Sequence, residues 1–557
     1  MSPVTRPLAR RGLAVGAVVA LGAAAAAPAY AAIVGAPIAY SASDAALSLT
    51  PIGTHETGVF DESAAEIVQF HAATQRLFTV DALAGQVRVL DASDPTDPTE
   101  LLDLVTAGVT AADKSVIPAG AVANSVAVRE DGLVLVAVES DPKTDRGWLV
   151  FFDAAGDGTA LGAVRVGAQP DMVTITPDGS RAVTADEGEP NDDYDVDPEG
   201  TISVVSLPGT VAVPKQAKVR TATFHSYEGS RLPEGVRIFA GIDGANHPVS
   251  RNLEPEYVTV DAASTTAYVT LQENNAIAVV DLHTARVTDI LPLGAKDHAV
   301  AGNGIDASNR DGGVSIQTWP IHGLYMPDAI ASYTVDGETY LVTANEGDAR
   351  EWGDYEEPVG YDDLVLCDDN PAAGLGDNEL LGRLDFTPES GLSADGSCYE
   401  ELYAFGARSF SIWTTDGAQV FDSGDDFEQI TAAAAPESFN ASNTNNELDN
   451  RSDNKGPEPE GVTIGEVEGR TYAFVGLERV GGVMVYDVTD PAASTFVTYV
   501  SNRDFGFDPE DELASAGDLG PEGLAFIPAA DSPSGAPLLA VANEVSGTTT
   551  LFEISIR

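Results

Sequence analysis

Residues 255–291 read PEYVTVDAASTTAYVTLQENNAIAVVDLHTARVTDIL, and this stretch decides the fold class. It contains four short runs rich in Val, Ile, Tyr and Thr, separated by turn residues, and its apolar residues show no helical spacing. β-branched and aromatic residues in runs of this length are typical of strands. The stretch therefore predicts one unit of four antiparallel strands.

The same pattern recurs in seven segments along the chain. Each opens with an acidic or amide residue, continues with an apolar strand and a turn, and closes a second apolar strand with an acid. The opening residues are Glu66, Asn124, Asp171, Glu256, Asp328, Glu460 and Glu522. The closing acids are Asp81, Glu139, Glu187, Glu273, Glu346, Glu478 and Glu544. Four-stranded units repeated around an axis make a β-propeller, so we predict an all-β, seven-bladed β-propeller. A β-helix fits less well, because its repeats are shorter and more regular.

Two of the opening glutamates stand between a proline and a glycine, in GPEPEGVTI from residue 456 and in GPEGLAFI from residue 520. Because consecutive strands are antiparallel, the start of the first and the end of the second lie on one face. With the first strand innermost, these acids gather at one mouth of the central channel. Crowded carboxylates favour a cation, and hard oxygen ligands favour Ca²⁺, with Mg²⁺ or Mn²⁺ as alternatives. The predicted metal ligands are Glu256, Asp328, Glu460, Glu522, Asp171, Glu346, Glu478 and Glu544. Structural ion pairs with nearby arginines are the alternative.

The N-terminal residues predict export. Arg6, Arg10 and Arg11 precede an apolar run over 13–27, and Ala-Tyr-Ala at 29–31 fits a cleavage site. We expect residues 1–31 to be a signal peptide of the Sec or twin-arginine type, and residues 32–557 to be a secreted, extracellular single domain. No later stretch is apolar enough to span a bilayer. The chain ends in LFEISIR without an anchor signal, so we expect it to be released or only loosely held. We also expect a monomer.

The net charge of the chain restricts the classes of partner that it can bind. It carries 29 Lys and Arg against 87 Asp and Glu, a formal net charge of −58 that removal of residues 1–31 would change to −61. Such a chain repels nucleic acid and anionic membranes. We therefore expect divalent cations as partners, together with a phosphorylated small molecule or an extracellular polymer.

Three stretches, 206–254, 292–326 and 347–457, are too long for turns within a blade, and we predict that they are insertions that cap one face. The third holds the only two cysteines, Cys367 and Cys398, which we expect to form a disulfide in an exported protein. The loop EGEPNDDYDVDPEG (187–200) alternates oxygen ligands and is a candidate second Ca²⁺ site, although Pro198 stands where an EF-hand needs glycine. Its ligands would be Asn191, Asp193, Asp195 and Asp197. A solvated acidic turn is the alternative.

The chain resembles the secreted propeller family called choice-of-anchor I, which is related to mesenchyme-specific cell-surface glycoproteins. The resemblance rests on a set of motifs that runs from residue 56 to 545: ETGVFDESAAEIVQF, VANSVAV, PDMVTITPDG, EGEPNDDYDVDPEG, LEPEYVTV, NEGDAREW, FGARSFSIW, FDSGDDFEQI, RSDNKGPEPEGV and PEGLAFI. It implies an extracellular protein, sometimes labelled alkaline-phosphatase- or phytase-like. The resemblance does not assign a catalytic role to any residue of this chain.

Three functions remain open at this point. The first is a Ca²⁺-dependent phosphoester hydrolase in which a metal-bound water attacks and basic side chains hold the phosphate. The clamp candidates are Arg408, Arg451, Lys455 and Arg479. The second is a non-catalytic surface or matrix protein that binds a calcium-bridged polymer or mineral, and the third is a lactonase-like metal hydrolase. The propeller fold supports all three.

Overall fold

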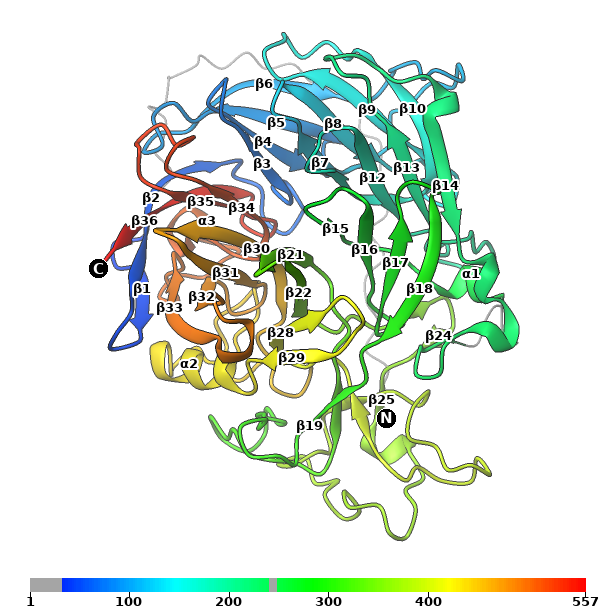
Figure 1. The fold of residues 1–557 in the computed structure, drawn as a ribbon. Helices are drawn as coiled ribbons and strands as arrows, with labels where there is room; N and C mark the ends of the chain where they lie inside the picture. Colours follow the sequence, from blue (N-terminus) through cyan, green and yellow to red (C-terminus); the bar gives the residue numbers. More distant parts are fainter. Residues whose placement is uncertain (1–32, 240–247) are drawn as a thin grey trace, which may run out of the picture. The chain divides into compact units, whose positions relative to one another are not determined.

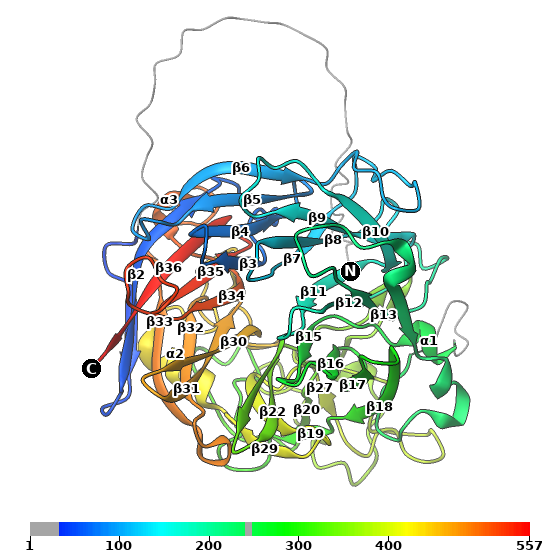
Figure 2. The ribbon, with the colours of Figure 1, turned by 45° about the horizontal axis from the view of Figure 1, so that its top comes forward.

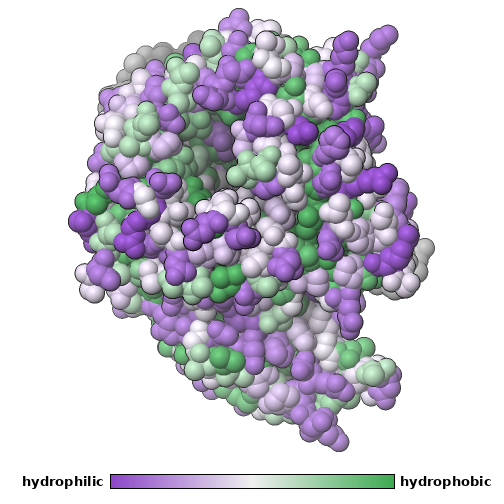
Figure 3. Space-filling view, in the orientation of Figure 1, coloured by the Kyte–Doolittle hydropathy of each residue, from purple (hydrophilic) through white to green (hydrophobic). Residues whose placement is uncertain are grey.

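The computed structural model of the protein describes residues 33–239 and 248–557. The segment expected to be a signal peptide lies outside these residues. Strand accounts for 41% of the structure and helix for 6%, which confirms the all-β prediction. Hydrophilic side chains cover most of the face shown in Figure 3, as the acidic composition requires.

The unit at 255–291 folds into one antiparallel sheet with the expected order. Its strands are β15 (Val258–Val260), β16 (Thr266–Leu271), β17 (Ala276–Asp281) and β18 (Arg286–Pro292). The register pairs Val258 with Val269 and Val269 with Ala278, so apolar side chains line up across the sheet. Cross-strand pairs of this kind stabilise a sheet.

Further sheets repeat this order and stand side by side in a ring (Figure 2). One consists of β3 (Val68–His71), β4 (Arg76–Asp81), β5 (Gln86–Asp91) and β6 (Thr99–Val105), and the next of β7 (Ala123–Val128), β8 (Leu133–Val138), β9 (Arg146–Asp153) and β10 (Gly162–Ala168). Two more consist of β11 (Pro170–Ile175), β12 (Arg181–Asp186), β13 (Thr201–Ser206) and β14 (Val219–Thr223), and of β21 (Ile330–Val335), β22 (Glu338–Asn345), β28 (Ser409–Thr414) and β29 (Gln419–Asp422). β8 is buried at every position, as expected for a strand covered on both faces by neighbouring sheets. The β-propeller prediction is confirmed, and the count of seven blades stays a prediction.

The two ends of the described chain meet in the ring. One sheet consists of β34 (Pro521–Ile527), β35 (Leu538–Asn543), β36 (Thr548–Ile556) and the N-terminal β2 (Leu47–Glu56), and its neighbour of β30 (Pro459–Val467), β31 (Arg470–Leu477), β32 (Val483–Asp487), β33 (Thr495–Ser501) and β1 (Ile38–Ser41). β2 pairs with β36 from Leu47–Ile556 to Glu56–Thr548. N- and C-terminal strands therefore share sheets, which closes the ring.

The predicted insertions contribute more to the ring than expected. β14 falls in the stretch 206–254, and β28 and β29 fall in 347–457, yet all three complete blade-like sheets. Another part of the inserted chain forms a separate sheet of β19 (Ala295–Asp297), β20 (His322–Leu324), β27 (Tyr403–Ala404), β26 (Asp385–Phe386) and β25 (Val359–Gly360). This sheet lies below the ring in Figure 1.

Smaller elements complete the inserted chain. They are the hairpin of β23 (Glu351–Trp352) and β24 (Tyr355–Glu356), and the helices α1 (Val249–Asn252) and α2 (Asp426–Ala434). The helix α3 (Leu513–Ala516) lies outside the inserted chain, between β33 and β34. Cys367 and Cys398 form a disulfide in the third insertion. Besides the strands that complete blade-like sheets, the described parts of the inserted stretches therefore contain a sheet, a hairpin and a disulfide of their own.

Candidate functional site

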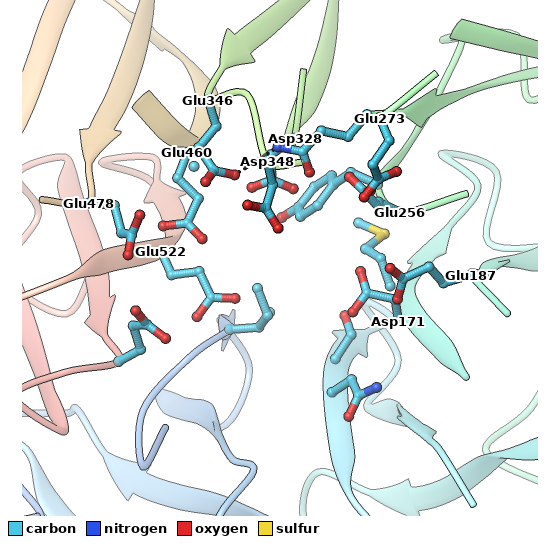
Figure 4. Close-up of a pocket in the computed structure, with 18 of the residues that line it drawn as sticks. Asp171, Glu187, Glu256, Glu273, Asp328, Glu346, Asp348, Glu460, Glu478 and Glu522 are labelled. Atoms are coloured by element: carbon cyan, nitrogen blue, oxygen red, sulfur yellow. Dashed lines mark hydrogen bonds between the residues drawn. The ribbon is translucent and has the colours of Figure 1, made fainter. Parts of the chain in front are cut away.

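A cavity of about 340 Å³ lies where the innermost strands of the ring begin. Twelve carboxylates line it: Asp171, Glu187, Glu189, Glu256, Glu273, Asp328, Glu346, Asp348, Glu460, Glu478, Glu522 and Glu544. Figure 4 shows the carboxylates it labels turned from several strands toward the same space. All eight residues predicted as metal ligands are among the twelve. They lie on the same face, as the antiparallel order of the strands predicts.

The Pro-Glu-Gly motif has a structural explanation that the sequence did not reveal. A side chain at position 461 would overlap the carbonyl oxygen of Glu522, and one at position 523 would overlap that of Glu66. Gly523 N also donates a hydrogen bond to Glu66 O at 3.1 Å. Glycine after each glutamate therefore lets neighbouring innermost strands approach closely near the axis, and this close approach crowds the carboxylates together.

Four of the carboxylates that line the cavity keep an oxygen without a partner. The Oε2 atoms of Glu256, Glu273, Glu460 and Glu522 are buried and accept no hydrogen bond from any residue that the structure describes. The side chains of Glu256 and Glu273 are only 6% and 7% exposed. Buried polar atoms are nearly always satisfied, so oxygens of this kind indicate a missing donor or cation.

Burial and mutual repulsion disfavour the charged form of these acids. Burial raises the pKa of Asp171 to about 7 and that of Glu273 to about 8, and neighbouring carboxylates add to both effects. Burial also raises the pKa of Glu256, with a further contribution from the charge of Glu273. The pKa values of Glu460 and Glu522 rise for the same reasons, with the charge of Glu478 as the largest source of repulsion for Glu460 and that of Glu66 for Glu522. A cation in the cavity would relieve this repulsion.

One sector of the cavity wall is already neutralised by basic side chains. Lys455 Nζ lies 2.8 Å from Glu346 Oε1, and Arg479 contacts Glu478 at 2.9 Å. Both bases also reach Glu458, a fully buried carboxylate that Arg451 binds as well. Burial opposes ionisation of Glu458, but the charges of Lys455, Arg479 and Arg451 outweigh it and lower its pKa. In this sector the geometry fits structural ion pairs, the alternative to metal binding.

The anion clamp predicted from the sequence does not assemble around the cavity. Of its four members only Arg479 lines the cavity. Arg451 and Lys455 are engaged by Glu458 and Glu346. Arg408 is buried elsewhere, where it binds Glu428 and the carbonyl oxygens of Asp306, Ser452 and Asn454.

At the cavity, two sets of three acids each bring one carboxylate oxygen per residue within 4.8 Å of the other two. The basic side chains nearby do not neutralise either set completely. One consists of Asp328, Glu346 and Glu460, and the other of Glu66, Glu522 and Glu544. Glu66 was not among the predicted ligands, although its place at the opening of the first repeat unit was a signal for it. Glu458 was also missed, because its role depends on bases that are brought to it by folding.

The candidate calcium loop at 187–200 is arranged as a turn. Asn191 Oδ1 accepts hydrogen bonds from the backbone N–H groups of Asp195 and Val196 at 3.0 and 2.9 Å, and its Nδ2 donates to Asp195 Oδ1 at 2.7 Å. Within the described parts of the chain, neither Asp193 nor Asp197 joins a group of three converging carboxylates. The structure therefore does not bring the four predicted ligands together, and the side chain of Asn191 is used to hold the turn.

A model of the choice-of-anchor I domain matches residues 66–491, from the first repeat unit to β32 and the turn that follows it. The chain belongs to the choice-of-anchor I domain family. None of the helices in residues 33–239 and 248–557 has the length and apolar character that a membrane span requires.

Two curated relatives share part of this choice-of-anchor I domain. A mesenchyme-specific cell surface glycoprotein from Strongylocentrotus purpuratus is 34% identical over 290 residues, which cover 45% of this chain and 37% of that protein. Gigasin-3a from Magallana gigas is 31% identical over 185 residues, which cover 31% of this chain and 65% of that protein. The matches thus span less than two thirds of either relative. Among solved structures, Kuenenia stuttgartiensis hydrazine synthase aligns over 90% of this chain and 98% of its own at 13% identity and a TM-score of 0.46, too low a similarity to carry an argument.

The raised pKa values predict how the stability of this choice-of-anchor I domain depends on pH. In EDTA, the free energy of unfolding should fall by about 2 kcal/mol between about pH 7 and about pH 9, because each pKa unit is worth about 1.4 kcal/mol. The sign follows because raised pKa values make the folded protein hold protons that the unfolded chain releases. Burial lowers the pKa of His55 to about 4 and that of His298 to about 3, so these groups act with the opposite sign only at lower pH.

Urea denaturation in EDTA at the two ends of this range measures the effect. Saturating Ca²⁺ should flatten the dependence, since the cation replaces the protons. A free energy of unfolding that rises with pH over this range would contradict the prediction.

Proposed function

We propose that this choice-of-anchor I protein is an extracellular propeller that binds divalent cations, Ca²⁺ foremost, in its central cavity. The observation that carries the proposal is the set of four buried, partnerless carboxylate oxygens on Glu256, Glu273, Glu460 and Glu522. Among the described residues that line the cavity, the charged oxygen donors are carboxylates, and flexible sets of oxygen ligands favour Ca²⁺, with Mg²⁺ and Mn²⁺ behind it. The family and the cell-surface relative support the extracellular location.

The distribution of charge favours binding over catalysis. A phosphoester hydrolase needs basic side chains that are free to hold the phosphate. Arg479, which lines the cavity, is paired with Glu458 and Glu478, and Lys455 is paired with Glu346. We therefore place a non-catalytic role first, in which the bound cations bridge the protein to an acidic extracellular polymer or mineral. A phosphoester hydrolase, or a lactonase-like metal hydrolase, is the second candidate.

A double variant tests the cation site. Replacement of Glu460 and Glu522 by Gln keeps the shape of the cavity and removes two ligand charges, so isothermal titration calorimetry should show at least a tenfold loss of Ca²⁺ affinity, or about 1.4 kcal/mol. The matched control is Glu466→Gln, because Glu466 lies on the same strand β30 but is exposed to solvent. If the double variant binds Ca²⁺ as tightly as Glu466→Gln, Glu460 and Glu522 are not metal ligands.

The choice between binding and hydrolysis needs its own experiment. Metal analysis of the purified protein would be followed by phosphomonoesterase and lactonase assays with Ca²⁺ and with EDTA. We expect bound Ca²⁺ without turnover above the buffer control. Turnover that EDTA abolishes and that Glu460→Gln/Glu522→Gln lacks would put the hydrolase first.

A further inference from the structure

A second group of acids lies outside the central cavity, where two inserted segments meet. Asp306 and Asp311 belong to the loop between β19 and β20, and Asp449 belongs to the segment between α2 and β30. One carboxylate oxygen from each lies within 4.8 Å of the other two. Asp306 and Asp449 are 1% and 4% exposed, whereas Asp311 reaches solvent.

No basic side chain neutralises this group. Among the residues that the structure describes, no salt bridge involves Asp306, Asp311 or Asp449. The nearby Arg408 gives its charge to Glu428 instead. Burial, with a smaller contribution from the charges of Asp449 and Glu428, raises the pKa of Asp306 to about 7. Three acids that share one place without a counter-ion are costly.

An independent feature beside this group indicates a ligand. The side chain of Asn440 is fully buried, and its Nδ2 donates to Ser452 Oγ at 2.9 Å and to Glu428 Oε1 at 3.1 Å. Ser452 donates in turn to Asp449, and Glu428 accepts the backbone N–H of Asp306. The amide is therefore held between the residues that bind Asp306 and Asp449, and its Oδ1 has no hydrogen-bond partner in the described chain.

A second partnerless amide oxygen lies in the loop that carries Asp306 and Asp311. Asn309 stands between Asp306 and Asp311, and its Oδ1 is also buried without a partner in the part of the chain that the structure describes. Neutral amide oxygens and carboxylates together are the donor set that Ca²⁺ prefers, and they leave no soft ligand for a transition metal. A cation held by the three acids, which have no basic partner among the described residues, would account for a partnerless amide oxygen beside them.

We propose that Asp306, Asp311 and Asp449, with Asn440 Oδ1 as a neutral ligand, form a second Ca²⁺ site that is separate from the central cavity. The cation joins the inserted stretch 292–326 to the stretch 347–457. Its role is to hold these two stretches together beside the ring. The site is independent of the central one, because none of its residues lines the central cavity.

The test uses Tb³⁺ as a luminescent substitute for Ca²⁺ in the full-length protein that carries Glu460→Gln and Glu522→Gln. Trp319 is suited as the sensitiser, because its Nε1 donates to the carbonyl oxygen of Ile305, the residue next to Asp306. We expect tryptophan-excited Tb³⁺ emission that Ca²⁺ displaces. Asp311→Asn should weaken Tb³⁺ binding at least tenfold.

Asp311→Asn is the cleanest variant because Asp311 is the least buried of the three acids, and the one hydrogen bond that its side chain accepts within the described chain is long, at 3.4 Å from Gly313 N. Its control is Asp297→Asn, since Asp297 is exposed in the same stretch and likewise accepts a bond from the residue two positions on. Both variants should melt like the parent protein in EDTA. Hydrogen exchange in 304–315 and 440–453 should slow with Ca²⁺ in the parent and in Asp297→Asn, but not in Asp311→Asn. Equal Tb³⁺ affinity in the two variants, or emission that Ca²⁺ does not displace, would overturn the proposal.

Discussion

Calcium at a thousand times its dissociation constant should raise the free energy of unfolding by about 4 kcal/mol, because a ligand that binds only the folded state stabilises it by RT ln(1 + [L]/Kd). The melting temperature should rise by several degrees, and EDTA should reverse the change. The physical source is the relief of repulsion among the carboxylates of the cavity, where Glu256 and Glu273 are buried with partnerless oxygens. Differential scanning calorimetry with Ca²⁺ and with EDTA measures it.

The variant Glu256→Gln separates this mechanism from a general effect of calcium on an acidic surface. In EDTA above neutral pH the variant should be more stable than the parent, because it removes a buried carboxylate whose pKa is raised. In Ca²⁺ it should gain less than the parent, because it has lost a ligand. Glu466→Gln, at an exposed position, should show neither change. A parent melting temperature that EDTA leaves unmoved would rule out a stabilising cation in the cavity.

Replacement of Glu458 by Gln should lower the free energy of unfolding by roughly 3–5 kcal/mol, which is the usual cost of removing one partner from a buried ion pair. Glu458 is fully buried and holds three bases, with Arg479 Nε at 2.9 Å and Lys455 Nζ at 3.2 Å. The loss of the carboxylate leaves Lys455, Arg479 and Arg451 without their shared partner. Urea denaturation in EDTA measures the loss.

The neighbouring glutamate provides a matched comparison within one motif. Glu458 and Glu460 are the two acids of PEPEG, yet bases surround the first and carboxylates surround the second. In EDTA above neutral pH, Glu458→Gln should destabilise the protein and Glu460→Gln should stabilise it modestly. If both substitutions shift stability in the same direction, the division of the cavity into a neutralised sector and a cation-binding sector is wrong.

Much of the ring could be predicted because its information is local. The alternation of apolar and turn residues in 255–291 specifies four strands, and the recurrence of that unit predicts a propeller. The antiparallel order then places the start of the first strand and the end of the second on one face. For this reason the eight predicted ligands, with Glu256 and Glu460 among them, all line one cavity.

The long insertions are where prediction from the sequence was weakest. β28 and β29 return to the sheet of β21 and β22 after more than sixty residues of inserted chain, so their sequence gave no local sign that they belong to a blade. The clamp candidates Arg408 and Lys455 do not converge on one place, because folding pairs the first with Glu428 and the second with Glu346. Asn191 was read as a ligand, and the turn uses its side chain for hydrogen bonds.

By itself, the sequence determined the fold class and the face on which the acids gather, because strand pattern and strand direction depend only on neighbouring residues. The tertiary structure alone decided which acids are neutralised. Lys455 reaches Glu346 across 109 positions of the chain, and Asp449 meets Asp306 from another segment. The close approach at Gly461 and Gly523 likewise exists only once neighbouring strands converge. The charge state of a carboxylate depends on what lies within a few ångströms in space, and folding alone brings those groups together.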